Sequence, residues 1–175
     1  QPYAGLDGAP QVVCDSSTAL IDLNNLITGE QTGGVWTRTG TGGTFDATAG
    51  TFTPAAGATT STFTYALTGT APCINDSSLV NVTINAQPDA GTNGSTLVCD
   101  NSTALIDLNT LISGQQVGGT WTRTSGGLTG IFNAAAGTFM PTNAITSTFE
   151  YTLVGTAPCV NSTSIATVNI NAQPY

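Results

Sequence analysis

The side chains with the most chemical potential lie in a tetrapeptide, Trp-Thr-Arg-Thr, that occurs twice. The two copies span residues 36–39 and 121–124, and they contain the only basic side chains of the protein. An arginine that shares a strand face with a tryptophan could hold a carboxylate or help to bind a sugar ring. The candidate ligand contacts are therefore Trp36, Arg38, Trp121 and Arg123.

A structural role competes with ligand binding for these arginines. The sole cation of an acidic domain attracts an acidic partner, and acids recur at equivalent positions only as Asp15/Asp100 and Asp22/Asp107. We expect a structural ion pair, although a contact from Arg38 to Asp22 would need a strand edge or a bulge. We expect both tryptophans to lie in the core rather than on a sugar-binding platform. We expect Asp15 and Asp100 to cap a turn or the start of a helix.

A weaker candidate is a calcium site at the junction between the two copies. Asp89, Asn93 and Asp100 occupy positions 1, 5 and 12 of a calcium-binding loop pattern. Position 3 is Gly91, which has no carboxylate, and no helices are expected to flank the loop, so a plain turn is the alternative. The first copy has Tyr3 in place of Asp89, and no equivalent site is expected there. No other cofactor is expected.

Missing residue types narrow the function further. The chain has neither histidine nor lysine, so the commonest general base and transition-metal ligand is absent and a lysine Schiff base is impossible. Carboxylate pairs could serve a glycosidase, but the recurring acids fall at capping and strand positions, and we expect no enzyme. The net charge of −8 repels nucleic acid and anionic lipid. No apolar run is long enough to predict membrane insertion.

All of these residues belong to an internal duplication. Residues 13–39 realign with residues 98–124, and residues 61–88 realign with residues 147–174. The period is too long for a solenoid repeat and fits a whole small domain. The matching tripeptide Gln-Pro-Tyr at both ends predicts a two-repeat excerpt of a longer array. We expect the fragment to be monomeric, with neighbouring repeats of the same chain as its partners. We therefore predict one domain over 1–86, a second over 87–172 and the start of a third over 173–175.

Within each repeat the apolar pattern predicts short strands. In the first repeat we expect them at 11–14, 19–23, 35–39, 43–46, 50–54, 61–69 and 78–86. Alternation places Phe63, Tyr65 and Leu67 on one face, and it places Val80, Val82 and Ile84 on the core face. A helix over 18–27 is the competing interpretation of the second strand. About seven strands in a repeat of this length are typical of an immunoglobulin-like sandwich. The predicted fold class is all-β, with two tandem immunoglobulin-like β-sandwich domains and one disulfide each.

The four cysteines allow three pairings. Duplication favours one bridge in each repeat, Cys14–Cys73 and Cys99–Cys159. Closing a loop of about 60 residues would contribute roughly 4 kcal/mol of stability in the chain-entropy model. Disulfides would imply an oxidising, extracellular compartment. Four free, buried thiols are the alternative.

The sequence also resembles a known family, most specifically in the segments Gly-Thr-Ala-Pro-Cys, Gly-Gly-x-Trp-Thr-Arg-Thr and Asn-Ala-Gln-Pro-Asp-Ala-Gly. Over its whole length it is similar to the repeats of giant SprB-type cell-surface adhesins of gliding Bacteroidetes. The resemblance implies a very long filament that is exported by the type IX system and moved along the cell by the gliding motor. It implies a location on the cell surface, where these repeats would extend the adhesin and bear force. It brings no catalytic residues with it.

The alternative function, from a different class, is a carbohydrate- or surface-binding module. It would contact an external surface or polysaccharide through Trp36 and Arg38. Burial of both tryptophan side chains would count against it, because a buried ring cannot stack on a sugar.

Overall fold

The computed structural model describes residues 1–173, and its contacts divide the chain into two compact units. Unit 1 consists of Gln1–Gln87 together with Thr156–Cys159, and unit 2 consists of Pro88–Gly155 and the chain from Val160 onward. The tetrapeptide from Thr156 to Cys159, which the duplication assigns to the second repeat, thus belongs to the first unit. Of the segment 173–175, expected to start a third repeat, residues 174 and 175 lie outside the described residues.

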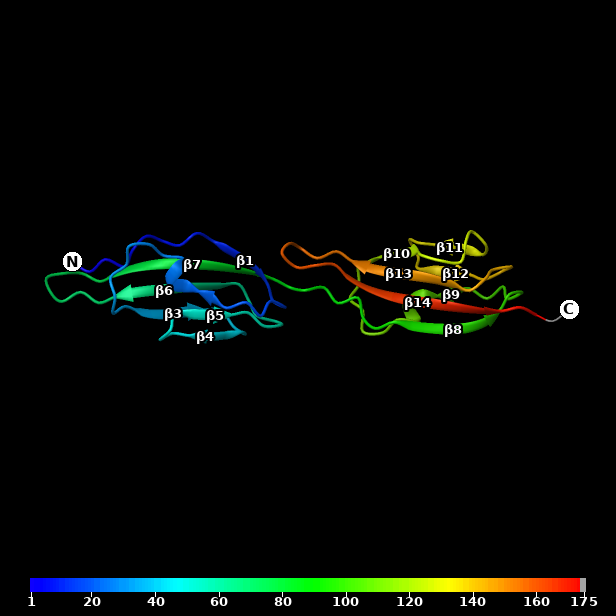
Figure 1. Ribbon diagram of the computed structural model, residues 1–175, viewed down its shortest axis with the longest axis horizontal. Coiled ribbons are helices and arrows are strands. Elements are labelled where there is room, and N and C mark those ends of the chain that lie inside the picture. The colour runs from blue at the N-terminus through cyan, green and yellow to red at the C-terminus, as the bar shows by residue number, and fades with distance from the viewer. Residues whose placement is uncertain (174–175) are drawn as a thin grey trace. The chain divides into compact units, whose positions relative to one another are not determined.

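Unit 1 is built from seven strands in two sheets. One sheet has the order β1-β7-β6-β3 (Figure 1), and the other has the order β2-β5-β4. The pairs β7–β6 and β6–β3 are antiparallel, whereas β1 runs parallel to β7. The strands are β1 (Gln11–Cys14), β2 (Ile21–Asp22), β3 (Val35–Thr39), β4 (Thr44–Asp46), β5 (Thr51–Thr53), β6 (Ser61–Leu67) and β7 (Asp76–Asn85).

Unit 2 repeats this arrangement with the sheet orders β10-β13-β14-β8 and β11-β12-β9. Here β8 runs parallel to β14, as β1 does to β7 in unit 1. The strands are β8 (Gly94–Cys99), β9 (Ile106–Asp107), β10 (Thr120–Arg123), β11 (Ile131–Asn133), β12 (Thr138–Met140), β13 (Ser147–Leu153) and β14 (Ser162–Asn171).

The predicted alternation along the two long strands is confirmed. Phe63, Tyr65 and Leu67 of β6 are buried, and Val80 and Val82 of β7 are fully buried, because successive side chains of a strand point to opposite faces. Ile84 is partly buried and packs against the same core. Each unit therefore has its own apolar core between its two sheets.

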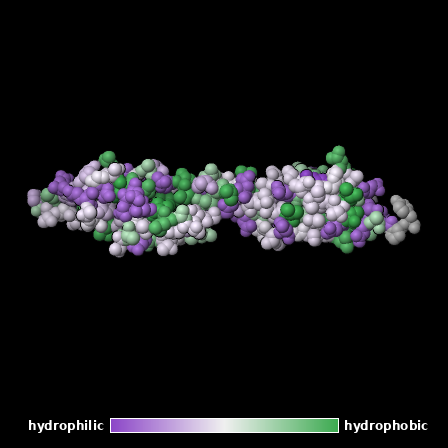
Figure 2. All heavy atoms as spheres, in the orientation of Figure 1, coloured by the Kyte–Doolittle hydropathy of each residue, from purple (hydrophilic) through white to green (hydrophobic). Residues whose placement is uncertain are grey.

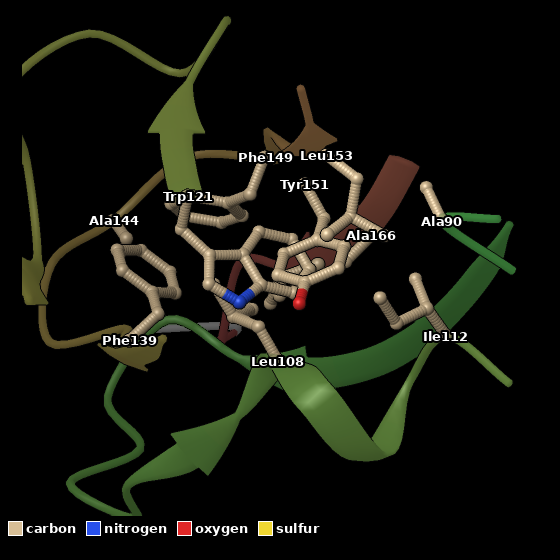
Figure 3. Close-up of a cluster of buried hydrophobic side chains, with 11 residues drawn as sticks. Ala90, Leu108, Ile112, Trp121, Phe139, Ala144, Phe149, Tyr151, Leu153 and Ala166 are labelled. Carbon is tan, nitrogen blue, oxygen red and sulfur yellow. The ribbon is translucent and has the colours of Figure 1, made fainter. Parts of the chain in front are cut away.

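The core of unit 2 surrounds a tryptophan. Figure 3 shows the indole of Trp121 among Phe139, Tyr151, Phe149 and Leu108. The rings of Trp121 and Tyr151 are tilted with centroids 5.2 Å apart, the separation at which aromatic pairs attract beyond simple burial. The equivalent rings of unit 1, Trp36 and Tyr65, lie at the same centroid distance.

The predicted second strand is shorter than expected, and no α-helix forms over 18–27. After β2 the chain enters a short 3-10 helix, η1 (Leu23–Asn25), whose N-cap is Asp22. The Asp22 carboxylate accepts a hydrogen bond from the backbone N–H of Asn24, so it stabilises a turn rather than meeting a cation. Unit 2 repeats the feature as η2 (Leu108–Thr110), capped by Asp107. Neither helix in the described chain approaches the length of a membrane span.

The predicted disulfide pairing is wrong. Cys14 is bonded to Cys159, while Cys73 and Cys99 are free and exposed. Strand direction explains this, because β1 is parallel to β7 and Cys14 is aligned with Asn85, the last residue of that strand. Cys73 lies before the first residue of β7, which has ten residues. At the usual strand rise, about 30 Å therefore separates Cys73 from Cys14 at the other end of that strand. A disulfide requires Cα atoms within about 7 Å, so no bridge can close inside a repeat.

The surface matches the composition. Figure 2 shows a visible face on which residues of intermediate and low hydropathy predominate, with the apolar residues gathered in a few groups. Exposed apolar side chains such as Leu6 before β1, Val35 of β3 and Leu97 of β8 are spread along the chain. Single apolar residues of this kind are normal on protein surfaces and do not mark a binding patch.

Candidate functional site

Arg38 lies against the edge of the unit 1 core. Its Nε donates a hydrogen bond to Ser61 Oγ at 3.0 Å, and one terminal nitrogen donates to the carbonyl oxygen of Thr41 at 3.1 Å. The guanidinium carbon is 4.4 Å from the centroid of the Phe52 ring and 5.7 Å from that of Phe63. The side chain therefore closes the core with a cation–π contact and fastens the glycine-rich loop after β3.

Arg123 does the same in unit 2 with more bonds. It donates to the carbonyl oxygens of Thr129 at 2.7 Å and Gly126 at 2.8 Å, and to Ser147 Oγ at 2.7 Å. Its guanidinium carbon is 5.0 Å from the ring centroid of Phe139. The loop after β10 differs in length and sequence from the loop after β3. The equivalent arginine therefore holds a different loop in each unit.

The expected ion pair does not form in the described part of the chain. Both guanidiniums are instead partnered by neutral oxygens and aromatic rings. Partial burial lowers the pKa of Arg38 and of Arg123 below the ordinary value for arginine, because it desolvates the charged guanidinium. A lowered pKa in the folded state disfavours the charged form, so folding carries a cost at every pH below that folded pKa. Because this range includes all ordinary working conditions, the cost does not vary with pH there.

An Arg38→Met variant is expected to lower the free energy of unfolding of unit 1 by about 1–3 kcal/mol. Methionine keeps the apolar contact with the rings but loses the charge-assisted hydrogen bonds and the cation–π attraction. Urea unfolding at low and high NaCl measures this loss in the free energy of unfolding. We expect the same loss at both salt concentrations and at every pH between 5 and 9. A loss that shrinks in high salt would show that a screened ion pair holds Arg38 instead. Arg123→Met is the matched variant for unit 2.

Both tryptophans are core residues, as expected. Trp36 is 3% exposed and Trp121 is 5% exposed. The Trp36 indole N–H donates to Asn24 Oδ1 at 3.0 Å, which satisfies its one polar group in place of water. Gly50 is required beside it, because a Cβ there would lie 2.6 Å from the indole nitrogen. The proposed sugar contact of Trp36 with Arg38 therefore lacks an accessible ring face.

The residues of the calcium pattern are not brought together. The strand β8 runs between Asn93 and Asp100 and separates them by about 20 Å. Asn93 Oδ1 accepts the backbone N–H of Ile165 at 2.8 Å, the same bond that Asp7 makes with Leu79 in unit 1. Asp89 Oδ1 accepts the N–H of Gly91, two residues on. These oxygens stabilise the start of the repeat as a turn, which was the alternative interpretation.

The acid after each strand cysteine makes long-range bonds at the end of its repeat, so the turn or helix-start cap expected of Asp15 and Asp100 is wrong. Asp15 is 8% exposed, and its two carboxylate oxygens accept the N–H groups of Gln87 at 2.8 Å and Gly57 at 3.2 Å. Asp100 makes the equivalent bond to the N–H of Gln173. Each carboxylate thereby fixes the residues that follow the last strand of its repeat.

The disulfide lies where β1 and β7 end side by side. Cys14 ends β1 and is aligned with Asn85 at the end of β7. Asn85 Nδ2 donates to the carbonyl oxygen of Ala157 at 2.8 Å and to that of Thr156 at 3.4 Å. Cys159 then meets Cys14 with Cα atoms 5.0 Å apart. The end of this strand pair thus holds Thr156–Cys159 by an amide clamp and a covalent bond.

Asn85 and Ser61 are functional positions that the sequence analysis missed. Asn85 recurs as Asn171 and Ser61 recurs as Ser147, each at the same place in its repeat. Ser61 is 1% exposed, and a buried hydroxyl needs a partner, which Arg38 supplies. The signal was the exact recurrence of small polar residues, which is hard to notice in a chain so rich in Ser, Thr and Asn.

One group of potential metal ligands gathers at the bridge. Among the described residues, Cys14, Asp15 and Cys159 place such atoms within 4.8 Å of one another. Two of the three are sulfurs of a disulfide, whereas a metal binds the thiolate. The cluster is therefore a covalent link and a hydrogen-bonded acid rather than a metal centre.

Comparisons with known proteins give a likeness in fold alone. The sequence matches no protein-family model and, at a significant level, no curated protein. The structure is similar to that of hemolin, an insect immune protein whose domain arrangement has implications for homophilic adhesion. The TM-score is 0.52 at 11% identity over 97% of this chain and 46% of hemolin, so the chain spans less than half of that protein. Human protocadherin-24 EC1-2 matches with a TM-score of 0.47 at 9% identity, covering 94% of this chain and 95% of that one.

Both units are immunoglobulin-like β-sandwiches. Two features of each unit agree with that fold. The first strand of the unit lies at a sheet edge next to the last strand, and the third strand carries a buried tryptophan. The predicted fold class is confirmed, but the described chain has one disulfide, Cys14–Cys159, and not one in each domain.

Proposed function

We propose that this chain supplies load-bearing stalk repeats of an extracellular adhesin, specifically of the SprB type that is secreted by the type IX system and used in gliding. The observation that carries the proposal is the disulfide between Cys14 and Cys159, because it joins residues of two successive sequence repeats that are 145 positions apart. A bond of this kind requires an oxidising compartment, which favours a location outside the cytoplasm.

The distribution of polar groups supports a structural role over a catalytic one. The carboxylates of Asp15, Asp22, Asp46 and Asp76 each accept backbone N–H groups, so they hold turns and strand ends in place. Both arginines fasten loops, and both tryptophans fill cores. The chemistry offered by these side chains is thereby used within the fold, as a passive mechanical element requires.

Antibody-coated beads on living cells test the proposal. On gliding Bacteroidetes that carry these repeats, beads bearing an antibody against the 175-residue chain are expected to attach to intact cells and travel along them. Beads that bind only after the cells are permeabilised would contradict the surface location. Beads that attach but stay still on moving cells would support a surface stalk and contradict the role in gliding. Beads with an antibody against a cytoplasmic protein are the control.

A further inference from the structure

The two free cysteines are equivalents of the two that are bonded. Cys99 ends β8 as Cys14 ends β1, and Cys73 lies in the loop before β7 as Cys159 lies in the loop before β14. The observed bond joins a strand-end cysteine of one repeat to a loop cysteine of the next repeat in the sequence. The chain thus contains one inter-repeat disulfide, and Cys99 and Cys73 are a free strand-end cysteine and a free loop cysteine of the same two kinds.

The cysteine loop has the same conformation whether or not its cysteine is bonded. In the bonded loop the N–H of Cys159 donates to the Thr156 carbonyl at 2.9 Å, and in the free loop the N–H of Cys73 donates to the Thr70 carbonyl at 2.9 Å. An asparagine side chain also accepts the N–H of the loop glycine in both, as Asn161 does from Gly155 and Asn75 does from Gly69. The exposed Cys73 is therefore presented in the geometry that Cys159 uses in its bond.

The strand-end cysteine is matched as well. Next to the bonded Cys14, the N–H of Asp15 donates to the Asn85 carbonyl at 2.9 Å, and next to the free Cys99, the N–H of Asp100 donates to the Asn171 carbonyl at 3.0 Å. Asn85 is the residue whose amide clamps Thr156 and Ala157. The carbonyls that it clamps belong to a Thr-Ala-Pro-Cys segment that recurs unchanged at residues 70–73.

We infer that Cys99 and Cys73 are the two ends of the same inter-repeat disulfide, each bonding the complementary cysteine of another repeat of this kind. Cys99 takes the loop cysteine of a following repeat, and Cys73 takes the strand-end cysteine of a preceding one. In such an array every repeat makes one disulfide with the repeat before it and one with the repeat after it, in addition to the peptide chain. The inference concerns covalent linkage and does not depend on what the array attaches to.

The bond forms by thiol–disulfide exchange with a disulfide oxidant, for which glutathione disulfide serves. The Cys73 thiolate attacks one glutathione sulfur, releases one glutathione thiol and becomes a mixed disulfide. The strand-end thiolate then attacks the Cys73 sulfur and releases the second glutathione. Two cysteine thiols lose two protons and two electrons in all, and one glutathione disulfide becomes two glutathione thiols. Exposure of both free cysteines permits both steps.

A tandem fusion of the chain tests the inference. Residues 1–172 are followed by a complete second copy, so that the junction reads Asn-Ala-Gln-Pro as it does at residues 85–88. Changing Cys73→Ser in the first copy and Cys99→Ser in the second leaves Cys99 and Cys73 to meet at the central junction. After folding in a glutathione redox buffer, the monomer is expected to have no free thiol, and non-reducing peptide mapping is expected to show a Cys99–Cys73 link.

The matched control exchanges the two sites. It carries Cys99→Ser in the first copy and Cys73→Ser in the second, so its remaining thiols lie in the outermost repeats and should stay free at two per monomer. Two free thiols in both fusions would overturn the inference, and loss of both thiols within monomers of both fusions would show unspecific oxidation and overturn it too. The Cys14–Cys159 link of each copy is the internal standard, and its absence would remove the template on which the inference depends.

Discussion

Held by its first and last residues with the Cys14–Cys159 bond closed, the chain is expected to expose no more than about 110 Å of contour, at about 3.5 Å per residue. Only residues 1–14 and 159–175 lie between the handles and the bridge, because the bond bypasses everything between the two cysteines. After reduction the whole chain is available, and its contour rises to about 600 Å on the same scale. Single-molecule pulling with and without a reductant measures both lengths.

Part of the short path is already extended within each unit. It contains β1 and the ten-residue strand β14, and strands already rise about 3.3 Å per residue. Tension on the oxidised protein therefore loads β1, β14 and the disulfide, and it bypasses the chain between Cys14 and Cys159. A Cys14→Ser variant is the control, and it should give the long contour without any reductant. Steps that reach the long contour in oxidised, unmutated protein would contradict the load path.

A Phe63→Ala variant is expected to lower the free energy of unfolding of unit 1 by about 3–5 kcal/mol. Phe63 is fully buried, and its ring centroid lies 5.0 Å from that of Phe52 and 5.3 Å from that of Phe45. Removing the ring leaves a cavity beside Phe45 and Phe52 and takes away one of the two rings near Arg38. A loss of this size is a large fraction of the stability of a small domain.

Hydrogen exchange followed by mass spectrometry assigns the loss to a unit. Peptides from β6 and β7 are expected to exchange faster in Phe63→Ala, while peptides from β13 keep their protection, because each unit has its own core. Phe149→Ala is the matched change in unit 2 and should reverse the pattern. Val35 is 61% exposed, so Val35→Ala should change hydrogen exchange in neither unit. Equal acceleration in both units after either phenylalanine change would show that the two cores unfold as one.

The strands could be predicted because their signal is local. The alternation of Phe63, Tyr65 and Leu67 reflects a period of two along one strand, and it needs no knowledge of the neighbouring chain. The extent of β2 was harder to predict. The Asp22 carboxylate accepts the N–H of Asn24 and so starts a 3-10 turn that ends the strand early. Local chemistry thus accounts for where the strands lie in the sequence, but not for how they pair.

The cysteine pairing could not be predicted because a periodic sequence does not distinguish bonds within repeats from bonds between successive repeats. Both preserve the duplication. What decides is the parallel pairing of β1 with β7, which places Cys14 at the far end of the unit from Cys73. The partner of Arg38 was missed for a related reason, because strand registry sets Phe63 directly opposite it and so provides aromatic rings where an acid was expected.

The way the two arginines are held has a consequence for proteolysis. A trypsin-like protease cleaves after arginine or lysine, and this chain offers it only Arg38 and Arg123. Cleavage needs an extended segment that can leave the protein and enter the protease, yet each arginine lies on a paired strand with its guanidinium hydrogen-bonded to a loop. The folded repeats therefore present trypsin-like enzymes with no readily accessible bond, so the proposed array would resist cleavage by such proteases.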